Sequence, residues 1–174
     1  MSSRSKITLV LQLAIFLIPM NIYVIGDWMG TGIQWIFLRY VQIMNNSSVI
    51  LLYQEIGLVV SGILTGKSAI ASVIWSVGVI LVVVATILVV YGTFKTNSGV
   101  LKKAAFVNLF GAVLFLLSIF VQYGIFFHGS AGIAIPFGII VLFVIVYWQY
   151  RISCVVEEDS GMNKEESGIA RGVR

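Results

Sequence analysis

The sequence predicts an all-α integral membrane protein: a bundle of four transmembrane helices, with five as the alternative, and one amphipathic helix in the membrane interface. Of its 174 residues, 59% are hydrophobic and only 10% are charged, whereas a soluble domain needs about 25% charged residues to cover its surface. The apolar residues are gathered into runs of about 20, which is the length that crosses a bilayer core. We therefore expect a multi-pass membrane protein that has the lipid bilayer as its main partner.

Four apolar runs are long enough to span the membrane, and they cover residues 7–25, 69–92, 103–127 and 131–150. The first follows Arg4 and Lys6, but its apolar stretch is too long for a signal peptide and no convincing cleavage site follows. A retained anchor is therefore expected. A fifth run at 49–66 is borderline because Gln54 and Glu55 lie in its first half. This run is interpreted either as a fifth span or as a re-entrant segment.

Between the first two runs, residues 28–45 have the pattern of an amphipathic helix. Apolar side chains recur with helical spacing, at Ile33, Ile36, Phe37, Tyr40 and Met44. Polar side chains occupy the other face, and Asp27 just before the segment is a suitable N-cap. The pattern predicts a helix that lies in the membrane interface, with a loop helix packed on the bundle as the alternative.

Basic residues concentrate on the cytoplasmic side of membrane proteins, and the four-span and five-span topologies satisfy this rule about equally. A fifth crossing would bring Glu55 into hydrocarbon at a cost of about 2.5–3.5 kcal/mol near the centre, which favours four spans. Both topologies place the loop at 95–103 in the cytoplasm and His128 outside. Residues 152–174 mix charges of both signs with Gly and Ser, so we expect a disordered cytoplasmic tail. It would follow a membrane domain at 1–151 in the cell membrane.

Small residues at four-residue spacing predict the seams along which membrane helices pack. The candidates are Ser68, Ser72, Ser76, Gly62, Gly66, Ala134 and Gly138. Polar side chains within the runs should also face protein rather than lipid, and these are Gln12, Asn21, Asn108 and Gln122. Such seams can join the helices of one chain or of two copies. The expected partners are therefore further copies of the chain or other membrane protein subunits.

Glu55 is the most informative residue for function, because an ionisable group inside an apolar run is costly unless something compensates for it. One interpretation is an ion or proton site, or part of a pore lining. The other, which we favour, is a structural carboxylate that pairs with Arg39, Lys67 or a backbone group. Asp27 and His128 could join these residues in one polar network near the outer face.

Composition excludes or disfavours several functional classes. Cys154 is the only cysteine and His128 the only histidine, so the chain cannot build a disulfide framework, a Cys-based metal site or bis-histidine haem ligation. The triplet at 66–68 resembles the end of a phosphate-binding loop, but Ser61 stands where that motif requires glycine. Basic residues lie at the ends of apolar runs rather than in a patch for nucleic acid. We expect no metal, no cofactor, no nucleic-acid partner and no catalytic residues.

The leading functional hypothesis is a non-enzymatic membrane subunit that oligomerises or associates with a larger membrane complex. The runner-up is a small channel or transporter in which Glu55 is the ion- or proton-sensitive group. A third hypothesis is a membrane-embedded enzyme that acts at the outer interface through His128 and Asp27. The scarcity of clustered reactive groups favours the first hypothesis over the third.

Overall fold

The computed structural model describes residues 3–26, 29–95, 97–129 and 132–171. Within these residues the chain forms five helices and one six-stranded antiparallel sheet. The fold is therefore mixed α and β, and the prediction of an all-α bundle is wrong. In chain order the elements are α1 (Ser3–Ala14), β1 (Asn21–Ile25), β2 (Gly30–Gln34), β3 (Leu38–Ile43), β4 (Asn46–Leu51), α2 (Leu52–Val60), α3 (Gly66–Lys95), α4 (Ser98–Tyr123), β5 (His128–Gly129), β6 (Gly132–Ile135) and α5 (Phe137–Arg171).

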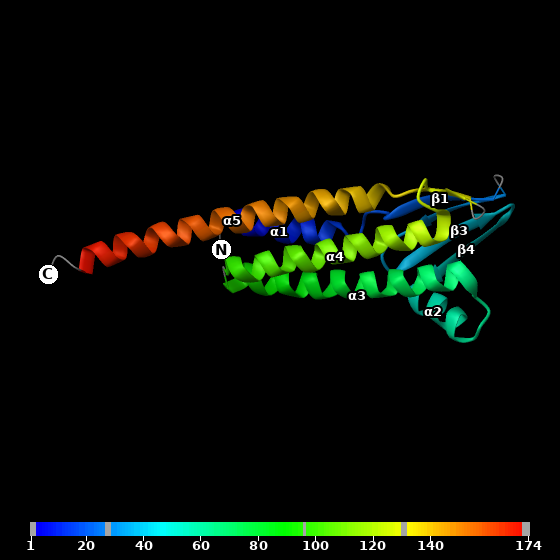
Figure 1. Ribbon diagram of the computed structural model, residues 1–174, viewed down its shortest axis with the longest axis horizontal. Coiled ribbons are helices and arrows are strands. Elements are labelled where there is room, and N and C mark those ends of the chain that lie inside the picture. The colour runs from blue at the N-terminus through cyan, green and yellow to red at the C-terminus, as the bar shows by residue number, and fades with distance from the viewer. Residues whose placement is uncertain (1–2, 27–28, 96, 130–131, 172–174) are drawn as a thin grey trace.

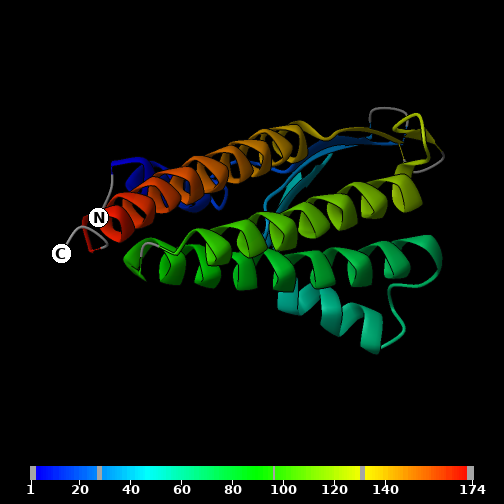
Figure 2. The same cartoon turned by 60° about the vertical axis from the view of Figure 1, so that its left-hand side comes forward.

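The long helices lie side by side, and the sheet lies at one end of the bundle (Figure 1). Both ends of the chain lie toward the opposite end. The short helix α2 packs on the side of α3 that faces away from α4 (Figure 2). Two separate connections build the sheet, because β1 to β4 follow α1 whereas β5 and β6 join α4 to α5. The sheet therefore ties the first part of the chain to its last helical hairpin.

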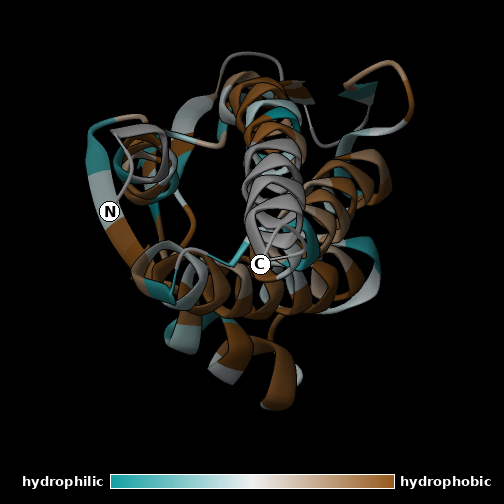
Figure 3. Ribbon diagram, turned by 90° about the vertical axis from the view of Figure 1, so that its left-hand side faces the viewer, coloured by the Kyte–Doolittle hydropathy of each residue, from teal (hydrophilic) through white to brown (hydrophobic). Residues whose placement is uncertain are grey.

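Three of the described helices are long and apolar enough to cross a membrane: α3, α4 and the Phe137–Val155 part of α5. They overlap the predicted runs at 69–92, 103–127 and 131–150, and they are compatible with an integral membrane protein. The last run was predicted to begin too early, because residues 132–135 form the strand β6 and the helix begins at Phe137. The helices of the bundle are largely hydrophobic (Figure 3). α3 has 30 residues and a length of about 45 Å, which exceeds the roughly 30 Å of a hydrocarbon core. Its first turns can therefore extend past such a core and lie beside the sheet.

The first predicted span, at 7–25, is only partly helical. α1 contains 12 residues and is about 18 Å long, so it is too short to cross a bilayer core as a helix. Turns follow Ala14, and β1 then begins in the sequence NIYVI, whose β-branched and aromatic side chains suit a pleated strand. At the other end of the chain, α5 continues to Arg171 through residues predicted to be disordered.

The predicted interfacial helix at 28–45 is wrong, because the described part of this segment forms β2, a turn and β3. The apolar spacing that indicated a helix also fits two antiparallel strands, since Ile33 and Tyr40 are cross-strand partners on one face of the sheet. The borderline run at 49–66 is not a span either. It divides into the last residues of β4, the helix α2 and a turn.

The strand order is β4-β3-β2-β1-β6-β5, and all neighbouring strands are antiparallel. β1 lies between β2, which follows it directly, and β6, which comes from the far end of the chain with Ile135 opposite Ile22. One face of the sheet is turned toward the helices. On this face the ring of Tyr23 lies 6.0 Å from the ring of Tyr123 in α4.

The closest helix pair, α3 and α4, meets at two glycines that the spacing of small residues did not indicate. A Cβ atom on Gly78 would lie 2.9 Å from the ring of Phe115, and one on Gly111 would lie 2.9 Å from Val82. Beside them the rings of Trp75 and Phe115 pack with centroids 4.4 Å apart. The two glycines allow the backbones to approach, which is how membrane helices commonly pack.

Replacing Gly138 with alanine is expected to lower the free energy of unfolding by about 1–3 kcal/mol through overpacking. Gly138 in α5 donates its N–H to the Met20 carbonyl (3.1 Å), and its Cβ would lie 2.3 Å from the Pro19 carbonyl oxygen. A backbone atom cannot move aside as a flexible side chain does. SDS titration in detergent micelles, followed by circular dichroism, measures the effect. Gly57→Ala is the control, because a Cβ there meets nothing within 4 Å; equal stability of the two variants would contradict the close contact.

Candidate functional site

Glu55 lies where α2, α3 and the sheet meet, and it is only 4% exposed. Its Oε1 atom lies 2.9 Å from Nη2 of Arg39, which comes from β3. The same oxygen accepts a hydrogen bond from Oγ of Ser72 in α3. A single carboxylate therefore joins three elements through charge-assisted contacts, which are stronger than neutral hydrogen bonds.

The local chain positions Glu55 in the first turn of α2. β4 ends at Leu51, and its backbone N–H donates to Oε1 of Gln54 (2.9 Å), so the helix begins without a loop. The Leu52 N–H donates to the Phe37 carbonyl (2.8 Å), which holds the start of α2 against the β2–β3 connection. A carboxylate in the first helical turn is also favoured by the positive end of the helix dipole.

The guanidinium of Arg39 lies between Glu55 and an aromatic pair. Its Cζ atom is 5.7 Å from the centre of the Tyr23 ring, within the range of a cation–π interaction. Burial raises the pKa of Tyr23 to about 12, against a smaller opposing effect of Arg39. Tyr23 is therefore a neutral phenol at physiological pH, and the ion pair of Arg39 and Glu55 is the charged centre of this site.

Several buried polar atoms on the inner face of the sheet have no hydrogen-bond partner among the described residues. They are Nε of Arg39, the hydroxyl of Tyr23 and both side-chain polar atoms of Asn21. Asn21 and Arg39 lie in one cross-strand row, because each is paired with Gln34 in β2. Buried water is the usual partner of such groups, so the inner face of the sheet is suited to hold water near the ion pair.

A second buried polar cluster lies inside the bundle and connects four helices. Gln12 of α1 donates to Oγ1 of Thr86 in α3 (2.8 Å) and accepts from Asn108 of α4 (2.6 Å) and from Gln149 of α5 (2.6 Å). Asn108 also donates to Oε1 of Gln149 (3.0 Å). Gln12, Asn108 and Gln149 are buried. The expectation that Gln12 and Asn108 face protein is confirmed.

The structure unites two of the five predicted network residues, Glu55 and Arg39. Lys67 is exposed in the first turn of α3, and His128 is exposed on β5. Asp27 lies outside the described residues. The two remaining polar residues of the predicted spans face protein: Asn21 is buried, and Gln122 donates to Ser68 (3.1 Å).

The predicted packing residues fall into three groups. Ser68 accepts a hydrogen bond from Gln122 of α4, and Ser72 donates to Glu55 of α2. Ser76 donates to the carbonyl of Ser72 within α3 itself (2.7 Å). Gly62 lies in the turn before α3 and Gly66 is the first residue of α3; their φ angles are positive, at 74° and 62°, and nothing lies within 4 Å of a Cβ at either position. They therefore allow the turn rather than a helix contact.

The last two predicted packing residues do contact other elements, but Ala134 does so from a strand. Ala134 is buried on β6 opposite Tyr23 of β1. Gly138 is the close-contact position in α5 already described. Gln149 and Thr86 were not among the predicted packing or polar residues. Their signal was the same as that of Gln12 and Asn108, namely a polar side chain in an apolar run.

Both sites consist of polar groups that already contact one another. The carboxylate of Glu55 is occupied by two partners, and the amides of the bundle cluster bond to one another. Among the described residues no group of three or more His, Cys, Asp or Glu side chains could hold a metal ion. The sites suit the role of joining helices and sheet.

The protein therefore has three membrane-length helices, and the segments that connect its helices at one end of the bundle form a single β-sheet. No protein-family model and no curated protein matches this chain.

Proposed function

We propose that the protein is a non-enzymatic integral membrane protein that associates side by side with further copies of itself through the outer face of its sheet. The observation that carries this proposal is a continuous apolar row across five strands. The row comprises Ile135, Ile22, Ile33, Tyr40 and Val49, which follow one another as cross-strand partners. We name it the apolar row.

The apolar row is accessible in the single chain. Ile22 is 39% exposed, and Val49 and Ile135 are each 58% exposed. An antiparallel sheet that faces water on one side normally carries polar residues there. The next row outward is polar toward β4, where Thr31, Gln42 and Ser47 are exposed. Ile33 and Tyr40 in the middle of the row are half-buried. Apolar surface that remains accessible in this way can mark an interaction site.

The environment of Glu55 supports a structural role over transport. A transport site needs a group that can exchange its partners, whereas Glu55 is almost fully buried between Arg39 and Ser72. The amides of Gln12, Asn108 and Gln149 are likewise satisfied by one another. These contacts favour a rigid scaffold that presents the sheet.

The distribution of basic residues supports a cell-membrane orientation with the tail in the cytoplasm. Lys6, Lys95, Lys103 and Arg151 are exposed at the end of the bundle away from the sheet. Arg39 and Lys67 lie at the sheet end. By the positive-inside rule, the sheet would face the outside.

Replacing Val49 and Ile135 together with serine is expected to weaken self-association at least tenfold. Burying one such side chain contributes about 1.5–3 kcal/mol, and about 1.4 kcal/mol changes affinity tenfold. Native mass spectrometry of the full chain in mild detergent, over a range of protein concentrations, measures the monomer fraction. Gln42→Ser is the matched control, since Gln42 is exposed on the same sheet face outside the apolar row.

Three outcomes are informative. Dimers or larger oligomers that dissociate in the double variant but not in Gln42→Ser support the proposal. A monodisperse monomer at every concentration of the wild type contradicts it. If the double variant leaves the oligomers unchanged, the interface between copies lies outside the apolar row.

A further inference from the structure

The helix α2 and the turn after it present an apolar stripe to the outside of the bundle. α2 lies on the side of α3 that faces away from α4 (Figure 2). Exposed side chains recur along it with helical spacing, at Tyr53, Ile56, Val60 and Ile63. Val60 is 83% exposed and Ile63 is 74% exposed, and no charged residue occurs from Ile56 to Gly66. We name these four exposed residues the α2 stripe.

The polar groups near the α2 stripe are bonded within the protein. The one charge on α2, that of Glu55, is buried in the ion pair described above. The hydroxyl of Ser61 donates to the Leu58 carbonyl (3.1 Å), which also accepts the Leu64 N–H (2.9 Å). The Ser61 N–H donates to the Gly57 carbonyl (2.9 Å). Hydrocarbon offers no hydrogen bonds, so these internal bonds are the kind that a segment in contact with lipid requires.

The position of α2 along α3 is that of the boundary region of a bilayer. α3 has 30 residues and a length of about 45 Å, which matches the roughly 40–45 Å of a bilayer that includes its headgroup regions. Its only charged residues, Lys67 and Lys95, lie at its two ends. The hydrogen bond from Ser72 to Glu55 holds the first turn of α2 roughly 8 Å along α3 from Lys67. Interfacial helices reach about 5–10 Å into the boundary between headgroups and acyl chains, so this depth suits α2.

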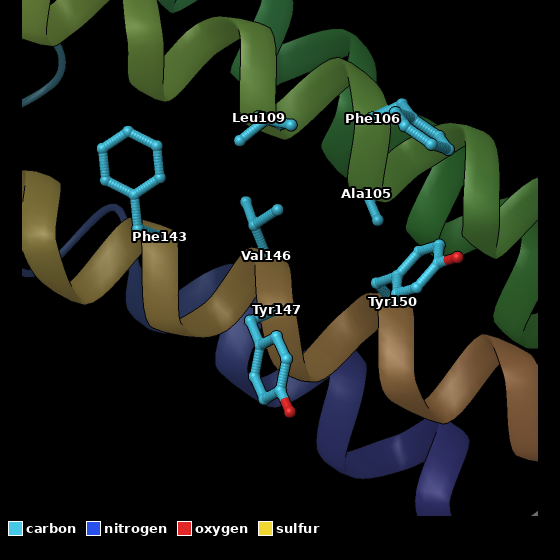
Figure 4. Close-up of a pocket in the computed structure, with 7 residues that line it drawn as sticks. All are labelled: Ala105, Phe106, Leu109, Phe143, Val146, Tyr147 and Tyr150. Atoms are coloured by element: carbon cyan, nitrogen blue, oxygen red, sulfur yellow. The ribbon is translucent and has the colours of Figure 1, made fainter.

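The α2 stripe also continues the outer surface of the spanning helices. Ile70 and Val73 of α3, on either side of the contact between Ser72 and α2, are each more than half exposed. Elsewhere on the bundle, apolar and aromatic side chains line a groove between α4 and α5, and no charged side chain lines it in the part of the chain that the structure describes (Figure 4). A helix that faces water carries polar side chains on its outer face, whereas α2 extends the apolar surface of the bundle.

We propose that α2 is an interfacial helix whose stripe contacts the acyl chains of one membrane leaflet, the leaflet on the sheet side. The proposal rests on the membrane placement proposed above. The ion pair of Glu55 and Arg39 then has a second consequence, because it removes the only charge of α2 from the lipid. Lipid fits the stripe better than a protein partner does. A specific protein interface is surrounded by a polar rim, for which residues 56–66 supply no charge.

The test measures the depth of α2 with single-cysteine variants of the full chain in phosphatidylcholine vesicles. Cys154 is replaced with serine, and a fluorescent maleimide is attached to Val60→Cys or Ile63→Cys. Quenching by lipid brominated in its acyl chains is compared with quenching by iodide in the water. Ile80→Cys is the control for lipid contact, because Ile80 is exposed in the middle of α3. Asn45→Cys is the control for water, because Asn45 is exposed in the turn between β3 and β4.

The labels at Val60 and Ile63 should lose at least half as much fluorescence to the brominated lipid as the label at Ile80. Iodide should quench them less than it quenches the label at Asn45. Quenching by iodide as strong as at Asn45, without quenching by the brominated lipid, would overturn the proposal and place α2 in water. Protection from both quenchers would also overturn it, because protein would then cover the stripe.

The controls separate this proposal from those on which it rests. If the brominated lipid did not quench the label at Ile80, the membrane placement would be wrong, and the proposal for α2 would fail with it. If the label at Ile80 were quenched and those at Val60 and Ile63 were not, only the proposal for α2 would fail. Self-association is measured independently, through the monomer fraction of the variants in the apolar row, since that row belongs to the sheet and not to α2.

Discussion

Replacing Glu55 with leucine is expected to lower the free energy of unfolding by about 3–5 kcal/mol, the usual cost of breaking a buried ion pair by removing one partner. The variant leaves the Arg39 guanidinium without its carboxylate and removes the acceptor of the Ser72 hydroxyl. The side chain of Arg39 retains 28% exposure, so water can compensate in part and a value near 3 kcal/mol is expected. Glu55→Gln keeps an acceptor oxygen and should have a smaller effect.

SDS titration in mild detergent measures these differences. Lys67→Gln serves as the control, because it removes an exposed charge near the same junction and should change stability by less than about 0.5 kcal/mol. The double variant Arg39→Met/Glu55→Leu should regain most of the loss, since a buried ion pair can often be replaced by packed apolar residues. If Glu55→Leu were as stable as the wild type, the ion pair would not hold the sheet to α2 and α3.

Replacing Asn108 with leucine is expected to lower the free energy of unfolding by about 2–4 kcal/mol. The substitution removes one of the three amides of the cluster, takes one hydrogen bond from Gln12 and leaves Oε1 of Gln149 without its donor. Each buried polar group left without a partner costs about 1–3 kcal/mol. Single hydrogen bonds between membrane helices contribute about 0.6 kcal/mol on average, so an effect of this size requires a cooperative network rather than one bond.

Thr93→Val is the matched comparison for Asn108→Leu. Thr93 is also a buried polar residue of the bundle, but its hydroxyl has no partner among the described residues. Its removal should leave stability unchanged or raise it slightly. Thermal unfolding of the three proteins in one detergent provides the measurement. A loss in Asn108→Leu no larger than that in Thr93→Val would contradict a stabilising role of the cluster.

Hydropathy alone located the three membrane-length helices, but it also counted the run at 7–25 as a span and extended the last run over residues 132–135, which form β6. The runs at 69–92, 103–127 and 131–150 correspond to α3, α4 and the first part of α5. These helices could be predicted from the sequence because a helix satisfies its backbone hydrogen bonds within one continuous segment. Polar residues inside such runs could also be expected to face protein, as Gln12 and Asn108 do.

The sheet could not be predicted in the same way. Its strands have at most six residues, and the spacing of Ile33 and Tyr40 fits a helix as well as a pair of strands. The pairing of Ile22 with Ile135 joins segments from opposite parts of the chain. Strand register depends on such distant partners, whereas the periodicity of a short segment reports only its own residues.

Glu55 shows the same difference between what a local segment predicts and what distant contacts determine. The sequence indicated that a carboxylate placed between apolar residues needs a compensating partner, and the candidates were Arg39, Lys67 or a backbone group. Only the tertiary structure decided for Arg39 and added Ser72, because β3, α2 and α3 converge there. The physical reason is that desolvation of a charge is a property of the residue and its local context, whereas the partner that compensates for it depends on the three-dimensional packing of the whole chain.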